Sequence, residues 1–255
     1  MKLINCIEEK ASKWVGYQRP AVDWKVTEKG NPNIRLRRTM HDFPEFGEVV
    51  NQIPYPLSRQ AMYNCMDEDL YKGYISTLLW HELRREPLPI CYYLPFLATS
   101  AEEIRERLLK IREHLKLGDM GLTELFKAVD NPTQLQIAPR IGYVRFSLAL
   151  DCLSCSNKIP HPLMFNQKMI TIHYALLLED LGDSQPFYHI ETRVTSDIMA
   201  ECYEDFCQRM GDIALWAGSG NPELLVDWLN YDKEGQQMYY QAIENITKFH
   251  TKSNV

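Results

Sequence analysis

Two cysteines and a histidine stand close together in the middle of the chain, and side chains of this kind bind zinc. Cys152 and Cys155 are three positions apart, and His161 follows them. Two thiolates at this spacing can reach one ion, but a structural zinc site takes four ligands. No second pair of cysteines follows at the spacing of a zinc ribbon. We therefore expect buried thiols here and no bound metal.

Other catalytic signatures are incomplete or missing. His81 and Glu82 begin the pattern of a zinc protease, but no second histidine follows four residues later. Neither a P-loop nor a GxGxxG fingerprint occurs. Gly218 and Gly220 follow an expected helix rather than a strand, which is typical of a helix end. These absences argue against enzymes that cradle a nucleotide phosphate, and we expect no cofactor.

The charge balance limits the possible partners. The 255 residues include 28 basic and 34 acidic side chains, which gives a formal net charge of -6. No global positive field therefore attracts nucleic acid, and a DNA-binding function would need a local basic face. Basic residues do gather between Lys25 and Arg38. A solvated strand edge that carries charge against aggregation is the alternative interpretation.

Composition and apolar runs indicate an ordinary globular protein, with 45% hydrophobic and 24% charged residues. No run approaches the ~18–20 apolar residues of a membrane span, so we expect no membrane partner. The first ten residues lack the apolar region of a signal peptide, and the seven cysteines are an odd number. Both observations favour a cytoplasmic protein with reduced thiols.

The elements that must position any site are mainly helices. Apolar residues recur at three- and four-residue spacings. We expect helices over residues 2–15, 67–86, 100–117, 141–153, 163–181, 195–216, 223–229 and 233–249. The helix within 141–153 is apolar nearly all round and should be the most buried element. Ser100 and Glu103 form a capping box at the start of another helix.

The N-terminal part has a different pattern. Residues 22–26 and 34–37 flank the turn signal Gly30-Asn31-Pro32-Asn33, which predicts a small β-hairpin. We expect a single domain over 1–255. Its first part, 1–57, would hold a helix, the hairpin and an irregular segment, and 58–250 would form a helical core.

The order of these elements resembles a known family. An early helix with the segment 75–80 is followed by two apolar helices around a proline-rich connection, by an extended segment over 187–194 and by terminal helices. Over about 70–245 this order is similar to the helix-hairpin-helix DNA glycosylase superfamily, in particular its 8-oxoguanine-glycosylase-fold branch. The resemblance implies a mainly α, glycosylase-like helical domain that flips a modified base out of duplex DNA and hydrolyses its N-glycosidic bond.

In that family a carboxylate at the start of a helix stabilises the positive sugar of the transition state, and some members add a nucleophilic lysine. Two alignments carry these groups onto the chain. In the first, Pro139-Arg140-Ile141-Gly142 resembles the hairpin turn, Val144 takes the lysine position and Asn166 takes the carboxylate position. Both reactive groups are then lost. In the second, Lys168 matches the lysine and Glu191 in Ile190-Glu191-Thr192-Arg193-Val194 matches the carboxylate.

The resemblance also implies contacts with DNA. We expect phosphate contacts from Arg37 and Arg38, and from Arg140 and Arg145 if these are exposed. Aromatic side chains near helix ends could wall a base pocket, and we expect Tyr92, Tyr93 and His189 in that role. The departures from the family pattern favour an unusual modified base, such as those of viral genomes, and hence a role in antiviral defence.

Two alternatives remain open. One is a DNA- or nucleotide-binding relative without catalysis, as the first alignment describes. The other is an acidic helical interaction protein, such as an inhibitor or immunity protein, which the negative charge favours.

Overall fold

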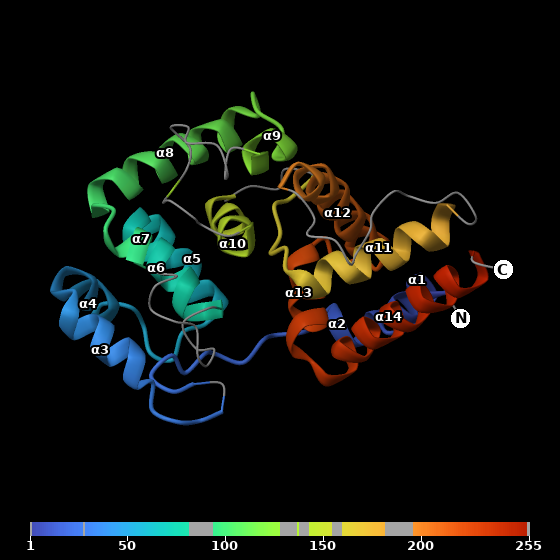
Figure 1. Ribbon diagram of the computed structural model, residues 1–255, viewed down its shortest axis with the longest axis horizontal. Coiled ribbons are helices and arrows are strands. Elements are labelled where there is room, and N and C mark those ends of the chain that lie inside the picture. Colours follow the sequence, from blue (N-terminus) through green and yellow to red (C-terminus); the bar gives the residue numbers. More distant parts are fainter. Residues whose placement is uncertain are drawn as a thin grey trace. The chain divides into compact units, whose positions relative to one another are not determined.

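The computed structural model describes residues 2–27, 29–81, 94–127, 137, 143–154, 160–181 and 196–253. This part of the chain is mainly helical, as expected (Figure 1). The helices are α1 (Leu3–Glu9), α2 (Ala11–Trp14), α3 (Ile34–Asp42), α4 (Pro44–Asn51), α5 (Arg59–Glu68), α6 (Leu70–His81), α7 (Leu94–Leu97), α8 (Ala101–Leu117), α9 (Leu122–Lys127), α10 (Tyr143–Leu153), α11 (Gln167–Leu181), α12 (Ser196–Trp216), α13 (Pro222–Tyr231) and α14 (Lys233–Ser253).

The chain divides into two compact units, one of residues 1–19 and 157–255 and one of residues 20–156. We call them unit 1 and unit 2. The expected single domain over 1–255 stays a prediction, since this division does not say whether the units fold independently.

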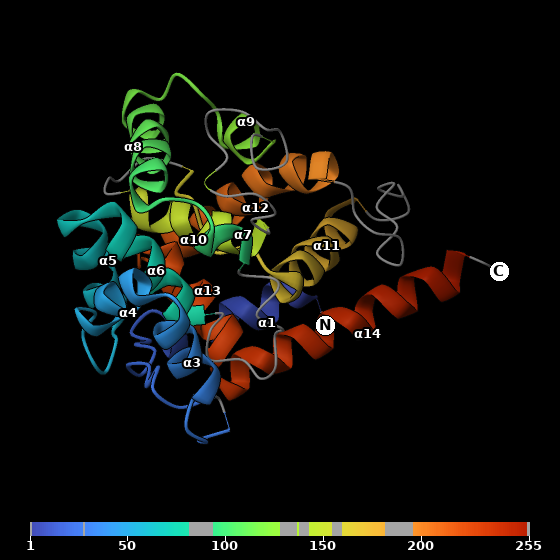
Figure 2. The ribbon, with the colours of Figure 1, turned by 60° about the vertical axis from the view of Figure 1, so that its left-hand side comes forward.

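Unit 1 joins the first helices to the last ones. Helix α14 packs along α11 and α13, and α1 lies against both α11 and α14 (Figure 2). The carboxylate of Glu179 on α11 accepts hydrogen bonds from the backbone N–H groups of Leu3 at 2.6 Å and Ile4 at 3.3 Å. The same carboxylate accepts from the side chain of Asn245 on α14 at 2.9 Å. A negative group at a helix N-terminus satisfies orphan N–H groups, so Glu179 fixes α1 to the unit.

Unit 2 is built around two apolar helices. Helix α10 contacts α5, α6, α8 and α9, and α6 also contacts α4, α5 and α8 (Figure 1). Residues 146–153 of α10 are all buried, which agrees with the expectation of a helix inside the core. Helix α6 is buried along nearly its whole length, and Gly73 lets it approach α5 closely. These two helices carry most of the core of unit 2.

The predicted N-terminal β-hairpin is not seen, and this expectation was wrong. Among the described residues of this region, β-pairing is limited to two isolated bridges, Val22 with Leu57 and Val26 with Pro32. The second predicted strand is instead the first turn of α3, whose N-cap Asn33 accepts a hydrogen bond from the N–H of Leu36 at 3.1 Å. A strand would place Ile34 and Leu36 on one face, whereas Ile34 is exposed and Leu36 is buried.

Other local predictions are confirmed. Ser100 caps α8 by accepting a hydrogen bond from the N–H of Glu103, and the helix ends at Gly118 with φ 65°. Helix α13 includes the predicted helix over 223–229, and Pro222 occupies its first turn. Within the described residues, no helix is both long and apolar enough to cross a lipid bilayer.

Candidate functional site

Asn166, which the first alignment matches to the family carboxylate, lies immediately before α11. Its side-chain oxygen accepts hydrogen bonds from the N–H groups of Lys168 at 3.0 Å and Met169 at 3.2 Å. Its side-chain nitrogen donates to the side-chain oxygen of Asn230 at 2.7 Å, and the residue is buried. Asn166 therefore occupies the start of a helix, but its oxygen already serves as the helix N-cap.

Lys168, the lysine of the second alignment, lies in the first turn of the same helix. Its side chain is half-buried, and Nζ donates a hydrogen bond to the backbone carbonyl of Asn230 at 3.2 Å. That carbonyl belongs to the last turn of α13, where a positive charge is favourable. Asn166 and Lys168, the candidates of the two alignments, thus both donate hydrogen bonds to Asn230. The sequence analysis did not identify Asn230.

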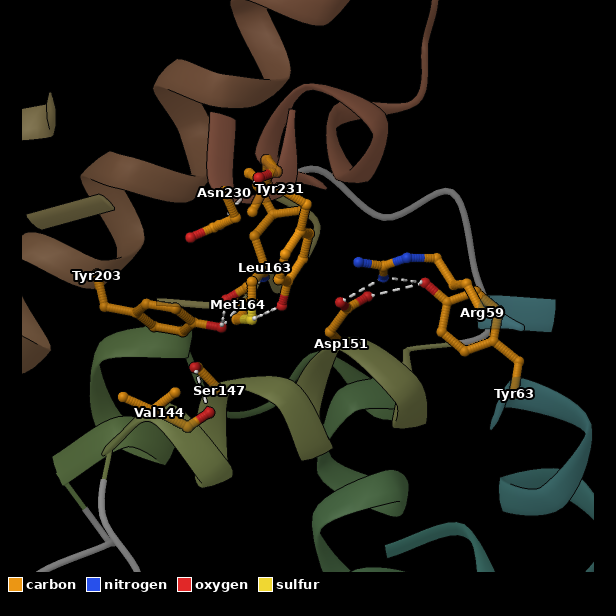
Figure 3. A network of polar contacts seen from close by, with 11 residues as sticks. Arg59, Tyr63, Val144, Ser147, Asp151, Leu163, Met164, Tyr203, Asn230 and Tyr231 are labelled. Carbon is orange, nitrogen blue, oxygen red and sulfur yellow. Dashed lines mark hydrogen bonds and ion pairs between the residues drawn. The ribbon is translucent and has the colours of Figure 1, made fainter. Parts of the chain in front are cut away.

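The connection that leads to Asn166 is held from α12. The hydroxyl of Tyr203 accepts from the N–H of Leu163 at 3.2 Å and donates to its carbonyl at 3.0 Å (Figure 3). Phe165 packs against Tyr203 and Phe206, with ring centroids 5.4 Å and 4.9 Å apart. All these residues are buried, so the backbone that positions Asn166 has little freedom.

The lysine position of the first alignment holds no reactive group. Val144 is the second residue of α10, and its carbonyl accepts a hydrogen bond from the Ser147 hydroxyl at 3.0 Å (Figure 3). The neighbouring Arg145 is half-buried rather than openly exposed. Its expected role as a phosphate contact stays a prediction.

Several expected site residues lie outside the described part of the chain: Glu191, Arg140, Tyr92, Tyr93 and His189. Cys155 also lies outside it, and Cys152 is buried in α10. Among the residues that the structure does describe, no group of three or more histidine, cysteine or acidic side chains could hold a metal ion.

Arg37 and Arg38 lie on a solvent-exposed face of α3. Ile34, Arg37, Arg38 and His41 follow one another at three- and four-residue intervals, and all four are exposed. We call these residues the cationic face of α3. Within the described residues, neither arginine forms an ion pair. Two unneutralised guanidinium groups on one helix face can bind phosphate oxygens.

A further lysine and an exposed tyrosine are connected to the start of α3. The carbonyl of Lys25 accepts a hydrogen bond from the N–H of Asn33 at 2.8 Å. The Lys25 ammonium lies 3.9 Å from the ring centroid of Tyr55, which packs edge-on against Trp24. The Tyr55 hydroxyl donates to Asp23 at 2.6 Å, and this hydrogen bond raises the pKa of Tyr55.

A buried charged cluster in unit 2 was missed by the sequence analysis. Arg59 donates to Asp151 at 2.8 Å and to the Tyr63 hydroxyl at 2.7 Å, and Tyr63 donates to Asp151 at 3.1 Å (Figure 3). Burial raises the pKa of Tyr63 well above its usual value, so its hydroxyl remains a donor. The sequence did hold one signal: a buried aspartate in an apolar helix requires a partner.

In unit 1, a second polar pair joins a buried histidine to an exposed aspartate. His173 on α11 is almost completely buried, and its Nε2 lies 3.2 Å from a carboxylate oxygen of Asp205 on α12. Burial lowers the pKa of His173, and Asp205 opposes this shift only in part. The imidazole is therefore held in its neutral form at neutral pH.

Comparisons with protein-family models, with curated proteins and with solved structures give no match. A functional proposal therefore draws on the geometry of the described residues and on the sequence pattern.

Proposed function

We propose that this protein binds duplex DNA and releases a modified base by N-glycosidic hydrolysis. The observation that carries the proposal is the cationic face of α3, in a chain whose net charge is -6. Phosphate contacts from arginine supply much of the affinity of DNA-binding proteins and need no matching base sequence. Arg37 and Arg38 are exposed and one turn or less apart on this face, so both can contact the DNA backbone.

The proposed chemistry rests on the family resemblance. Glu191 stabilises the positive charge that develops on the sugar and orients the attacking water. Lys168 lies at a helix start with its ammonium on the Asn230 carbonyl, so it contributes a phosphate contact or a nucleophilic amine. Water is the favoured nucleophile, because a charged ammonium bound to a carbonyl must lose a proton before it can attack.

A second candidate function is favoured by the hydrogen bonds of Asn166. Its oxygen accepts two backbone N–H groups and its nitrogen binds Asn230, so this amide is engaged in holding the fold. If the first alignment applies and the Asn166 amide positions no water, the protein is a DNA-binding relative without base release. The two functions share the cationic face of α3 and differ only in chemistry.

DNA binding is tested by fluorescence anisotropy with a labelled duplex at graded salt concentrations. Arg37→Gln and Arg38→Gln should each weaken binding and reduce the slope of log K against log salt by about 1. Lys248→Gln, which removes an exposed positive charge from α14, is the matched control and should leave the slope unchanged. No binding below micromolar concentration at moderate salt would leave the acidic interaction protein as the remaining reading.

Base release is tested by incubating the protein with genomic DNAs that carry different base modifications and scoring abasic sites by alkaline cleavage. Loss of cleavage by ~10²–10³ in Glu191→Gln, with DNA binding intact, supports the hydrolase. Loss in Asn166→Ala alone selects the first alignment, with an amide that positions water. Cleavage that appears only in Asn166→Asp identifies the relative without catalysis. Borohydride trapping of wild type but not Lys168→Gln would show an amine nucleophile.

A further inference from the structure

Helix α12 presents a second unusual surface, on the side that faces away from the core of unit 1. Asp205, Gln208, Asp212, Leu215 and Trp216 recur at three- and four-residue intervals, and we call them the acidic–apolar stripe. Leu215 is 66% exposed and Trp216 is 62% exposed. The opposite side of the helix is buried, with Tyr203, Phe206 and Met210 in the core. The stripe therefore ends in two large apolar side chains that are mostly exposed.

The end of α12 is closed by backbone hydrogen bonds, so these side chains lie on a capped helix terminus. The N–H of Gly218 donates to the carbonyl of Leu215 at 3.0 Å, and the N–H of Ser219 donates to that of Ala214 at 3.0 Å. Gly218 has φ 73°, the left-handed conformation that closes a helix C-terminus. An exposed tryptophan on a fixed backbone loses little conformational freedom on binding, which is typical of residues that dominate protein interfaces.

The same chain carries the complementary pattern on α3. The cationic face of α3 begins with Ile34, which is 57% exposed, and continues with Arg37 and Arg38 one turn later. On α12 the order is reversed: Asp212 comes first, and Leu215 and Trp216 follow one turn later. With a rise of about 1.5 Å per residue, two antiparallel helices of this kind place apolar groups against apolar groups and carboxylate against guanidinium. His41 then faces the polar side chain of Gln208.

We propose that the acidic–apolar stripe of α12 binds the cationic face of α3 in a second copy of this chain. The opposite charges and the equal, reversed spacing of the two faces argue for this occupant. A contact between two helices buries little surface, so the association is weak and its strength falls as salt increases. The proposal goes beyond DNA binding: the Asp212 carboxylate binds the arginines that phosphate would otherwise contact, so self-association and DNA binding exclude each other.

The test is sedimentation equilibrium of the full chain over a range of concentrations up to about 500 µM, at low and high salt. Asp212→Arg and Arg38→Asp should each raise the dimer dissociation constant by about tenfold or more, because each sets like charges against each other. The chain that carries both substitutions should recover association, since the ion pair is restored with its signs exchanged. Trp216→Ser should weaken association without changing its salt dependence.

Glu106→Arg on α8 is the matched control, because it makes the same charge change at another exposed position. Circular dichroism melting checks that each variant folds. A chain that stays monomeric at every concentration overturns the proposal, and so does a dimer that Arg38→Asp leaves unchanged. Added duplex should dissociate the dimer. If added duplex does not dissociate the dimer but the double variant does recover association, the result counts against the DNA-binding function and still supports self-association.

Discussion

The side-chain amides of Asn166 and Asn230 form a buried hydrogen bond of 2.7 Å that joins the start of α11 to the last turn of α13. Asn230 in turn donates from its side chain to the carbonyl of Val226 at 2.9 Å, so its amide orientation is fixed from both sides. One residue pair thereby sets the position of both candidate catalytic groups of this region, Asn166 and Lys168.

Replacing Asn166 by alanine should destabilise the protein by about 2–3 kcal/mol, because it removes a helix cap and leaves the Asn230 amide without its buried partner. Asn166→Ser keeps a capping oxygen, so its free energy of unfolding should fall less than that of Asn166→Ala. Urea denaturation followed by circular dichroism measures both variants. Equal losses in the two variants would show that the cap contributes nothing.

Two glycines within helices should respond to alanine in opposite directions. A Cβ on Gly73 in α6 would lie 2.3 Å from the Cα of Met66, so Gly73→Ala must push α5 and α6 apart and should destabilise by several kcal/mol. Gly211 in α12 has nothing within 4 Å of such a Cβ. Gly211→Ala should therefore stabilise by about 0.5–1 kcal/mol. Thermal melts of the two variants check the contrast, and a lower melting temperature for Gly211→Ala would contradict it.

Replacing only one partner of the Arg59–Asp151 pair should lower the free energy of unfolding far more than replacing both partners. The Asp151 side chain is 1% exposed, so Arg59→Met leaves a buried carboxylate without its cation and should cost about 3–5 kcal/mol. Arg59→Met together with Asp151→Leu should recover most of this loss, because no buried charge remains. Chemical denaturation of the single and double variants decides the matter, and additive losses would mean that the two residues do not interact.

Acid should destabilise the protein through His173. Its folded pKa is lowered by burial, while the unfolded histidine titrates near the usual ~6.5. As pH falls through that value, His173 becomes protonated in the unfolded chain but stays neutral in the folded chain. The free energy of unfolding therefore decreases from about pH 7 downward to the folded pKa. His173→Gln should flatten this part of the pH profile of the unfolding free energy. A pH profile that His173→Gln leaves unchanged would mean that His173 is not the group responsible.

Several helices were predictable because their signals are local, whereas α4 and α5 were not predicted. Ser100 with Glu103, and Pro222 after Gly220 and Asn221, mark helix starts within four residues of sequence. The strand prediction for the segment after Asn33 was wrong for a physical reason. The first four residues of this segment alternate between apolar and basic types, a pattern that is compatible with a strand and with one turn of helix. Asn33, which caps the helix, also belongs to the sequence pattern of a turn, so its capping role was not recognised.

The candidate site was less predictable because its contacts are distant in sequence. Asn166 and Asn230 are 64 residues apart, and Arg59 and Asp151 are 92 apart. Composition and spacing can identify a polar residue that needs a partner, as with Asp151 in its apolar helix, but not which partner the fold supplies. The basic character of the segment with Arg37 and Arg38 was predictable because the charge excess is local, whereas its helical conformation was not.

The division of unit 1 between residues 1–19 and 157–255 has a consequence for biosynthesis. Unit 2 is continuous in sequence and has all its contacts available once residue 156 has left the ribosome. Helix α1 is made before its partners in unit 1: the carboxylate that caps it belongs to Glu179, and Asn245 on α14 holds that carboxylate. Helix α1 therefore cannot reach its folded position until Glu179 and Asn245 have been translated. Until then its side chains Leu3 and Ile7, which are buried in the folded protein, remain exposed. During that interval its apolar side chains add to the exposed surface from which misassembly can start.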